Sequence, residues 1–96
     1  MADLQITCIT KSSLLGDHEY ISHAGNPAVN WWWTVNQIIS AIDNNQHTFF
    51  VLDQYGRRAN VGVVRAQGRR PHIRTYADGV WTDNLLSLNS CPWKAA

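Results

Sequence analysis

The chain has little cysteine: Cys8 and Cys91 are the only two among its 96 residues. Two cysteines are too few for a disulfide-rich scaffold, and no CxxC motif or cysteine–histidine pair indicates a zinc site. We expect Cys8, on the apolar side of an alternating run, to be a buried small side chain. Cys91, which precedes Pro92, is expected to be exposed, and no neighbour in the sequence would activate either thiol for catalysis.

Long apolar runs are also missing. No uninterrupted stretch approaches the roughly 20 residues that a membrane-spanning helix needs. Residues 1–3 lead into no apolar secretory core, which predicts a cytoplasmic protein with no membrane partner. Hydrophobic residues make up 45% and charged residues 16% of the chain, which excludes a disordered tail, a coiled coil and a collagen-like chain. This length and composition predict one globular domain over residues 1–96.

Acidic residues are absent from one segment of the chain. Residues 54–77 contain six arginines and no aspartate or glutamate, which gives this segment a charge of +6. Residues 1–53 carry −4 and residues 78–96 carry −1, so the net charge of +1 hides a strong asymmetry. Arginine suits bidentate contacts with the carboxylate or phosphate groups of a partner. The alternative is a solvated hairpin whose arginines pair with the chain's own acidic residues.

Strict alternation predicts a first strand over residues 4–10, with Leu4, Ile6 and Cys8 on one face. Residues 11–30 are punctuated by glycine, serine, asparagine and proline, and they are expected to form a long irregular segment. A loop of this length is uncommon in a small domain and is either functional or locally ordered.

A helix follows the irregular segment. Apolar residues at positions 35, 38, 39 and 42 form one stripe at helical spacing. Thr34 and Gln37 fit a capping box, in which each side chain accepts a hydrogen bond from a free backbone N–H of the first turn. An earlier start at Trp31 is the alternative, and Asn44–Asn45 suits a left-handed exit.

Three more strands are predicted, at residues 48–52, 59–65 and 72–76. Their connections are short and contain glycine, so the strands are expected to pair as antiparallel hairpins. Residues 85–88 are expected to fold back on the core as a short cap, with Trp81 and Trp93 beneath it. The sequence therefore predicts an α+β fold of order β-α-β-β-β, a two-layer domain with one helix packed on one face of an antiparallel sheet.

The triplet Trp31–Trp32–Trp33 comes directly before the helix. Three successive side chains cannot all face one surface, so at least one indole should be partly exposed. Exposed tryptophan favours interfaces, because its rigid ring buries a large area at little loss of entropy, and it can also stack on bases. Together with the arginines, these residues form the predicted partner-binding set: Trp31, Trp32, Trp33, Arg57, Arg58, Arg69, Arg70 and Arg74.

Histidine and acidic residues offer a second interpretation, a metal site. His18, Glu19 and His23 have the spacing HExxxH, whereas HExxH places two imidazoles on one face of a helix. A simpler role for them is to hydrogen-bond the backbone of the irregular segment. Asp78 and Asp83 could form an acid–base pair, but turn formation and helix capping explain them more simply.

Several stretches of the chain carry a family resemblance: Ile6–Lys11, His18–Ile21, Trp33, Arg74–Gly79, and Asp83–Leu88 with Cys91. They resemble small bacterial and phage-associated proteins grouped as domain of unknown function 3892, and the resemblance spans nearly the whole chain. The Asp-Asn-Leu-Leu-Ser-Leu segment is its most specific part. The resemblance implies no activity, cofactor or catalytic residue. The tryptophan triplet and the density of arginine depart from the family pattern.

These observations predict a small, non-catalytic binding or accessory protein. It would present the arginine-rich hairpin and exposed tryptophan to an anionic macromolecule. A protein partner, including a second copy of the chain, is favoured over nucleic acid, because no nucleic-acid-binding motif is present. No cofactor and no small-molecule substrate are expected. The alternative is a compact metal-dependent hydrolase that uses His18, Glu19, Asp78 and Asp83.

Overall fold

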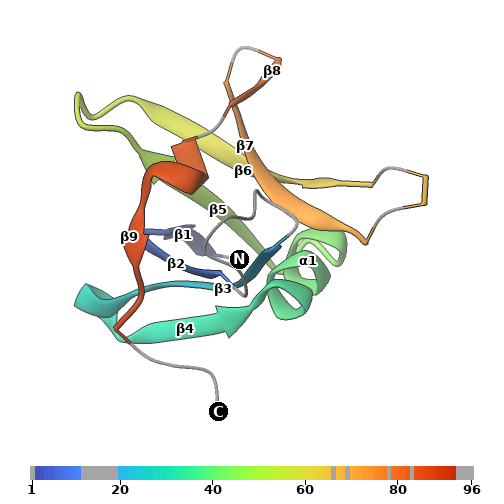
Figure 1. Cartoon of the computed structure of the whole chain (residues 1–96), viewed down its shortest axis with the longest axis horizontal. Coiled ribbons are helices and arrows are strands. Elements are labelled where there is room, and N and C mark those ends of the chain that lie inside the picture. The colour runs from blue at the N-terminus through green and yellow to red at the C-terminus, as the bar shows by residue number, and fades with distance from the viewer. Residues whose placement is uncertain are drawn as a thin grey trace.

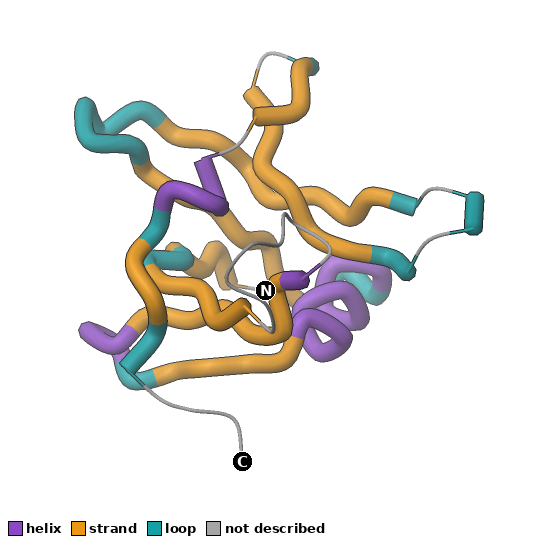
Figure 2. Tube along the Cα trace, viewed as in Figure 1, coloured by secondary structure: helices purple, strands orange, loops and turns teal. Residues whose placement is uncertain are grey.

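The computed structural model describes residues 2–11, 20–65, 67–68, 70–77, 79–82 and 84–92. They form one sheet of order β1-β5-β6-β7-β8, a second sheet of order β4-β3-β2-β9, and one α-helix (Figures 1 and 2). The strands are β1 (Ala2–Gln5), β2 (Cys8–Lys11), β3 (Ile21–Asn26), β4 (Trp31–Thr34), β5 (His47–Leu52), β6 (Arg58–Val64), β7 (His72–Ala77), β8 (Val80–Thr82) and β9 (Asn89–Ser90). The α-helix is α1 (Val35–Asp43), and the 3-10 helices are η2 (Pro27–Val29) and η3 (Asn84–Ser87).

The sheet content and the one α-helix agree with the predicted α+β class. The predicted arrangement differs, because the described chain forms two sheets instead of one antiparallel sheet. Strand β1 also pairs in parallel with β5, and β2 in parallel with β9. Parallel pairs join strands that are distant in sequence, so no hairpin turn announces them. Figure 1 shows the two sheets one above the other, with α1 between them at one side.

The first predicted strand is divided between the two sheets. The Ile6 N–H donates to the carbonyl of Phe50 in the five-stranded sheet at 2.8 Å. The next residue, Thr7, donates its N–H to the carbonyl of Gly25 in the four-stranded sheet at 2.9 Å. The chain therefore changes sheets within two residues. Alternation over residues 4–10 indicates extended backbone, but it cannot show which strands will pair with it.

Residues 21–29 form β3 and η2, so the prediction of an irregular segment is wrong there. Gly25 marks a close approach of two strands and not a loop. A Cβ atom at this position would lie 2.3 Å from the Trp31 carbonyl oxygen and 2.9 Å from the Trp32 Cα. Only glycine admits such close backbone contact. Lys11, at the start of the predicted irregular segment, belongs to β2, and residues 12–19 of that segment lie outside the described residues.

Helix α1 begins where the capping signal predicts. The Thr34 hydroxyl accepts the N–H of Gln37 at 3.1 Å, and the Gln37 Oε1 accepts the N–H of Thr34 at 2.9 Å. The predicted left-handed exit is confirmed at Asn45, whose φ is 55°. The alternative start at Trp31 is wrong, because residues 31–34 form β4. Within the described ranges, no helix has both the length and the apolar character to cross a membrane.

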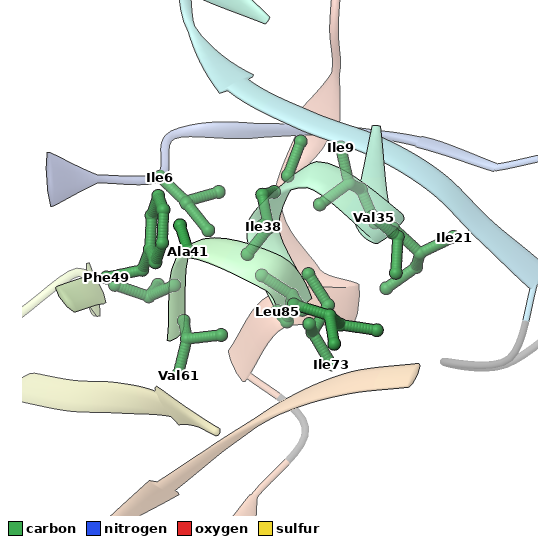
Figure 3. Close-up of a cluster of buried hydrophobic side chains, with 13 residues drawn as sticks. Ile6, Ile9, Ile21, Val35, Ile38, Ala41, Phe49, Val61, Ile73 and Leu85 are labelled. Carbon is green, nitrogen blue, oxygen red and sulfur yellow. The ribbon is translucent and has the colours of Figure 1, made fainter. Parts of the chain in front are cut away.

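The hydrophobic core lies between the two sheets and around α1. Figure 3 shows Ile38 and Ala41 of α1 among apolar side chains from other elements: Ile6, Ile9, Ile21, Phe49, Val61, Ile73 and Leu85. Leu85 of η3 is fully buried, which confirms that the C-terminal segment folds back on the core. Trp81, predicted to lie beneath that segment, is instead 44% exposed on the edge strand β8. Trp93 lies outside the described residues.

The predicted hairpins are confirmed: β5 pairs with β6, and β6 with β7, both antiparallel. Their turns place Gly56 and Gly68 at positive φ, which glycine adopts without steric strain. The structure adds β8, an unpredicted strand that pairs with β7 after the turn at Gly79. The five-stranded sheet is thus one strand wider than the hairpin signals indicate.

Cys8 and Cys91 form a disulfide, so the prediction of two separate thiols is wrong. Cys8 is buried as predicted, but Cys91 is buried as well. The two residues are 83 positions apart, and the parallel pairing of β9 with β2 brings them together. Cysteine spacing alone cannot reveal a pairing that depends on tertiary structure.

Gly25→Ala should destabilise the fold, because the added Cβ would collide with the backbone of β4. We expect the free energy of unfolding to fall by about 2–3 kcal/mol, as for other overpacked sites. Urea denaturation measures this loss. Gly68→Asn is the control, since open space surrounds Gly68 and asparagine tolerates positive φ. Similar losses in the two variants would contradict the close-contact explanation.

Candidate functional site

The three tryptophans of β4 do not share one environment. Trp31 and Trp33 pack against the buried cluster, and alternation places Trp32 on the opposite face. The Trp31 and Trp33 rings meet edge to face with centroids 5.3 Å apart, and each lies 6.0 Å from the ring of Phe49. The Nε1 of Trp31 is buried and has no hydrogen-bond partner among the described residues. Trp31 and Trp33 therefore contribute to the core, and Trp32 is the member of the triplet on the outer face.

Trp32 is held on the outer face of the four-stranded sheet. Its ring stacks on His23 with centroids 4.1 Å apart and an interplanar angle of 16°. Its Nε1–H donates to the Thr10 hydroxyl at 3.1 Å, and the Ser22 hydroxyl lies 2.9 Å from the His23 Nδ1. Burial lowers the pKa of His23, because desolvation disfavours the charged imidazolium. The stack thus presents a neutral, half-buried surface at neutral pH.

Three arginines form ion pairs with aspartates of the same chain: Arg57 with Asp53, Arg58 with Asp3, and Arg65 with Asp43. For these residues the structure follows the alternative in which the chain neutralises its own hairpin. The pairs lie at the surface, where solvent screens them and a partner's carboxylate can compete for the guanidinium.

Arg58 uses all three of its side-chain nitrogens. Its two terminal nitrogens donate to the two carboxylate oxygens of Asp3, at 2.6 and 3.0 Å, and its Nε donates to the Asn60 Oδ1 at 2.8 Å. The guanidinium lies over the ring of Phe50, 4.3 Å from the centroid. Hydrogen bonds from Arg58 and then Thr48 lower the pKa of Asp3. Arg58 is therefore a fixed, charge-balanced part of the outer face of the five-stranded sheet.

Arg57 is held less completely. Its side chain is 75% exposed, whereas that of Asp53 is 22% exposed. The Arg57 Nε donates to one oxygen of Asp53, and the backbone N–H groups of Tyr55 and Arg57 donate to the other. These bonds, led by the Arg57 N–H, lower the pKa of Asp53. Among the described residues, no acceptor engages the two terminal nitrogens of Arg57, which leaves them for a partner.

The remaining arginines are spread along the sheet. Arg70 is exposed at the end of β6 opposite to Arg57. Arg74 lies on β7 and donates from its Nε to the Thr82 carbonyl at 3.1 Å. Arg69 lies outside the described residues. The arginines of the predicted set therefore do not gather at one end of the hairpin.

An aromatic surface, which the sequence did not predict, lies on the outer face of the five-stranded sheet. Tyr76 and Trp81 are cross-strand partners whose rings meet edge to face at 5.6 Å. They are 38% and 44% exposed. Both rings lie beside Gly62, where an added Cβ would meet Tyr76 at 3.1 Å and Trp81 at 3.3 Å. The missing side chain of Gly62 leaves the space that the two rings cover.

Tyr76 and Trp81 lie on the same sheet as several arginines. We call this region the aromatic–arginine surface, and its members are Arg57, Arg58, Asn60, Arg74, Tyr76 and Trp81. Alternation in β7 already places Arg74 and Tyr76 on one face. The sequence feature that could have placed Trp81 on this surface is the turn at Gly79, because it allows residues 80–82 to return beside β7.

Two hollows flank this surface, and Arg58, Asn60 and Tyr76 line both of them. The first has a volume of about 460 Å³ and reaches Asp3 and the C-terminal end of α1. The second has a volume of about 490 Å³ and reaches Arg57 and the start of η3. The surface therefore combines exposed aromatic rings with two depressions that could receive partner side chains.

The first hollow lies where β5 and β6 separate. Their pairing ends at Phe50 and Asn60, although β5 extends back to His47 and β6 continues to Val64. The Ala2 N–H donates to the His47 Nδ1 at 3.2 Å, so a neutral His47 carries its proton on Nε2. The wall of this hollow therefore mixes polar side chains, His47 among them, with the apolar Ile42, Phe49 and Val61.

The residues of the hydrolase alternative are not placed by the structure. His18, Glu19, Asp78 and Asp83 all lie outside the described residues. Within the described ranges, no group of three histidine, cysteine, aspartate or glutamate residues could hold a metal ion. His23, the last residue of the HExxxH pattern, stacks on Trp32 instead. The hydrolase alternative stays a prediction.

Comparison with protein families gives a match over most of the chain. The model of a family described as protein of unknown function (DUF3892) matches residues 5–89. The chain belongs to the DUF3892 family. The match confirms the resemblance carried by the first strand and the Asp-Asn-Leu-Leu-Ser-Leu segment. No curated protein and no solved structure matches the chain.

The carboxyl group of Asp3 should titrate below the ordinary aspartate value of about 3.9, because its ionised form accepts hydrogen bonds from Arg58 and Thr48. A pKa lowered by folding stabilises the protein above the unfolded value, and this stabilisation is lost as the pH falls through the folded pKa. Carbon-13 NMR of the Asp3 carboxyl group measures the midpoint directly.

Two variants control this titration. Arg58→Gln should move the Asp3 midpoint up toward the ordinary value. Arg57→Gln, which removes the partner of Asp53, should leave the Asp3 midpoint where it is. An Asp3 midpoint that is the same in the wild type and in Arg58→Gln would show that the ion pair does not form in solution.

Proposed function

We propose that this DUF3892 protein is a small, non-catalytic binding protein that takes up an acidic segment of a protein partner on the aromatic–arginine surface. The observation that carries the proposal is the placement of two exposed rings, Tyr76 and Trp81, on one sheet with Arg58, next to the exposed Arg57 of the β5–β6 turn. Tyrosine, tryptophan and arginine are the residue types most enriched at the energetic centres of interfaces.

The surface favours a partner segment with two kinds of side chain. An aromatic or large aliphatic side chain would pack against Tyr76 and Trp81 and enter one of the flanking hollows. A carboxylate would bind the terminal nitrogens of Arg57, which can donate two parallel hydrogen bonds. Arg58 would contribute mainly by position, because its nitrogens already bind Asp3 and Asn60.

A protein partner is favoured over nucleic acid. The affinity of a protein for nucleic acid rises with the number of cations that neutralise phosphates. Three of the described arginines already pair with aspartates, and Arg70 lies at the far end of β6. A second copy of the chain is also less suitable, because three of the aspartates that could supply its acidic surface are engaged in these pairs. A cytoplasmic location is part of the proposal and is supported by the sequence alone.

Selection from a library of displayed random peptides tests the proposal and does not require that the natural partner be identified. The protein should enrich peptides that combine aspartate or glutamate with an aromatic or large aliphatic residue. Tyr76→Ala and Trp81→Ala should each weaken the binding of an enriched peptide by about tenfold or more, as expected for central interface residues. Added salt should weaken binding further. Fluorescence anisotropy measures these affinities.

The control is Tyr20→Ala, which removes a tyrosine of similar exposure, 44%, directly before β3 of the other sheet. It should leave peptide affinity unchanged. In a nitrogen-15 NMR titration, the Trp81 indole and Asn60 amide signals should shift more than the Trp32 indole signal. Equal losses in Tyr20→Ala, or tighter binding of single-stranded oligonucleotides than of any selected peptide, would contradict the proposal.

A further inference from the structure

The C-terminal segment closes the free edge of β2. Strand β9 pairs in parallel with β2 through only two register positions, Cys8 with Asn89 and Ile9 with Ser90. The Cys91 N–H then donates to the Ile9 carbonyl at 2.9 Å. Figure 1 shows β9, in red, running from η3 along the edge of the four-stranded sheet. This segment is the last described element of the chain.

Few non-covalent contacts hold this segment. Asn89, Ser90 and Pro92 are exposed. Leu85 is fully buried, and Leu88, which directly precedes β9, packs partly buried against the core cluster, whereas Asn89 and Ser90 are not part of that cluster. A parallel pair of two residues is weak on its own. The attachment of β9 to β2 therefore depends on the disulfide that joins Cys8 to Cys91.

We propose that the Cys8–Cys91 disulfide is a reversible redox modification site that latches the C-terminal strand. A dithiol reductant opens it, and residues 89–92 leave β2 while the core and α1 stay folded. The core does not depend on the released residues, because Ile6, Phe49 and Ile73 pack with Leu85, which lies before β9.

The chemistry is thiol–disulfide exchange and needs one dithiol for each opening. A thiolate of the reductant attacks the sulfur of Cys91, the less buried of the two residues (9% exposed against 3% for Cys8), and Cys8 leaves as a thiolate. The second thiol of the reductant then attacks the mixed disulfide and releases Cys91. Two electrons and two protons pass to the protein, which gains two thiols, and the reductant becomes a disulfide.

Opening the latch changes which strand forms the sheet edge. In the closed state β2 lies between β3 and β9, and β9 pairs with its first two residues, Cys8 and Ile9. In the open state the Ile9 carbonyl loses its partner and β2 becomes the edge. An unpaired edge is a template for a strand from another chain. The latch thereby ties an interaction surface, distinct from the aromatic–arginine surface, to the redox state of the surroundings.

NMR of the full-length chain with and without dithiothreitol tests this proposal. In the reduced protein, the amide order parameters of Ser90 and Cys91 should fall below about 0.6, the range of flexible backbone. The signals of Phe49 and Ile73 should keep their dispersed chemical shifts. Mass spectrometry after alkylation in native buffer should find no adduct on the oxidised protein and two adducts on the reduced protein.

Variants separate the latch from general effects of the reductant. Cys91→Ser should show the flexible segment without any reductant, and dithiothreitol should then change nothing. Ser90→Ala keeps both cysteines and should behave as the wild type. Loss of dispersed core signals on reduction would make the disulfide a staple of the whole fold. Rigid Ser90 and Cys91 amides in the reduced wild type would show that non-covalent contacts suffice. Either result would overturn the proposal.

Discussion

Both sheets depend on one extended segment, residues 2–11. Two successive N–H groups, those of Ile6 and Thr7, donate hydrogen bonds to different sheets. The sheets therefore cannot move apart unless this segment loses its hydrogen bonds to one of them. The arrangement also sets the direction of each face. Because the apolar sides of both sheets turn toward α1, their outer faces point away from each other. The aromatic–arginine surface and the stack of Trp32 on His23 therefore belong to different sides of the molecule.

The aromatic–arginine surface is ordered before any partner arrives. Arg58 bridges from β6 to Asp3 on β1, and it crosses Phe50 of the strand between them. Gly62 has no side chain, and the rings of Tyr76 and Trp81 pack over the space that this leaves. Ordered side chains lose less entropy on binding than mobile ones do. Under the proposed function, the intramolecular ion pairs would assist recognition even where they neutralise charge, because they fix the positions of their neighbours.

Local signals in the sequence predicted the local elements well. The capping box at Thr34 and Gln37, the exit at Asn45 and the β5–β6 and β6–β7 hairpins all depend on residues close together in the chain, and all are confirmed. The irregular segment was predicted wrongly around Gly25, because glycine interrupts a strand in one context and permits two strands to approach closely in another. Local propensity carries no information about which of these applies.

Features that depend on distant residues could not be predicted. The parallel pairs β1–β5 and β2–β9, and the disulfide that follows from the second, have no turn or spacing that announces them. The surface was predicted only in part. Arg57, Arg58 and Arg74 of the predicted set belong to it, but the rings beside them are Tyr76 and Trp81 and not the triplet at residues 31–33. Burial of Trp31 and Trp33 depends on Phe49, which lies on β5 beyond the helix.

The disulfide between Cys8 and Cys91 also closes a covalent loop that contains residues 8–91. All of the described helical structure, and every described strand except β1, lies within this closed loop. A single cleavage in the exposed turn around Tyr55 would therefore leave one covalent molecule in place of two fragments.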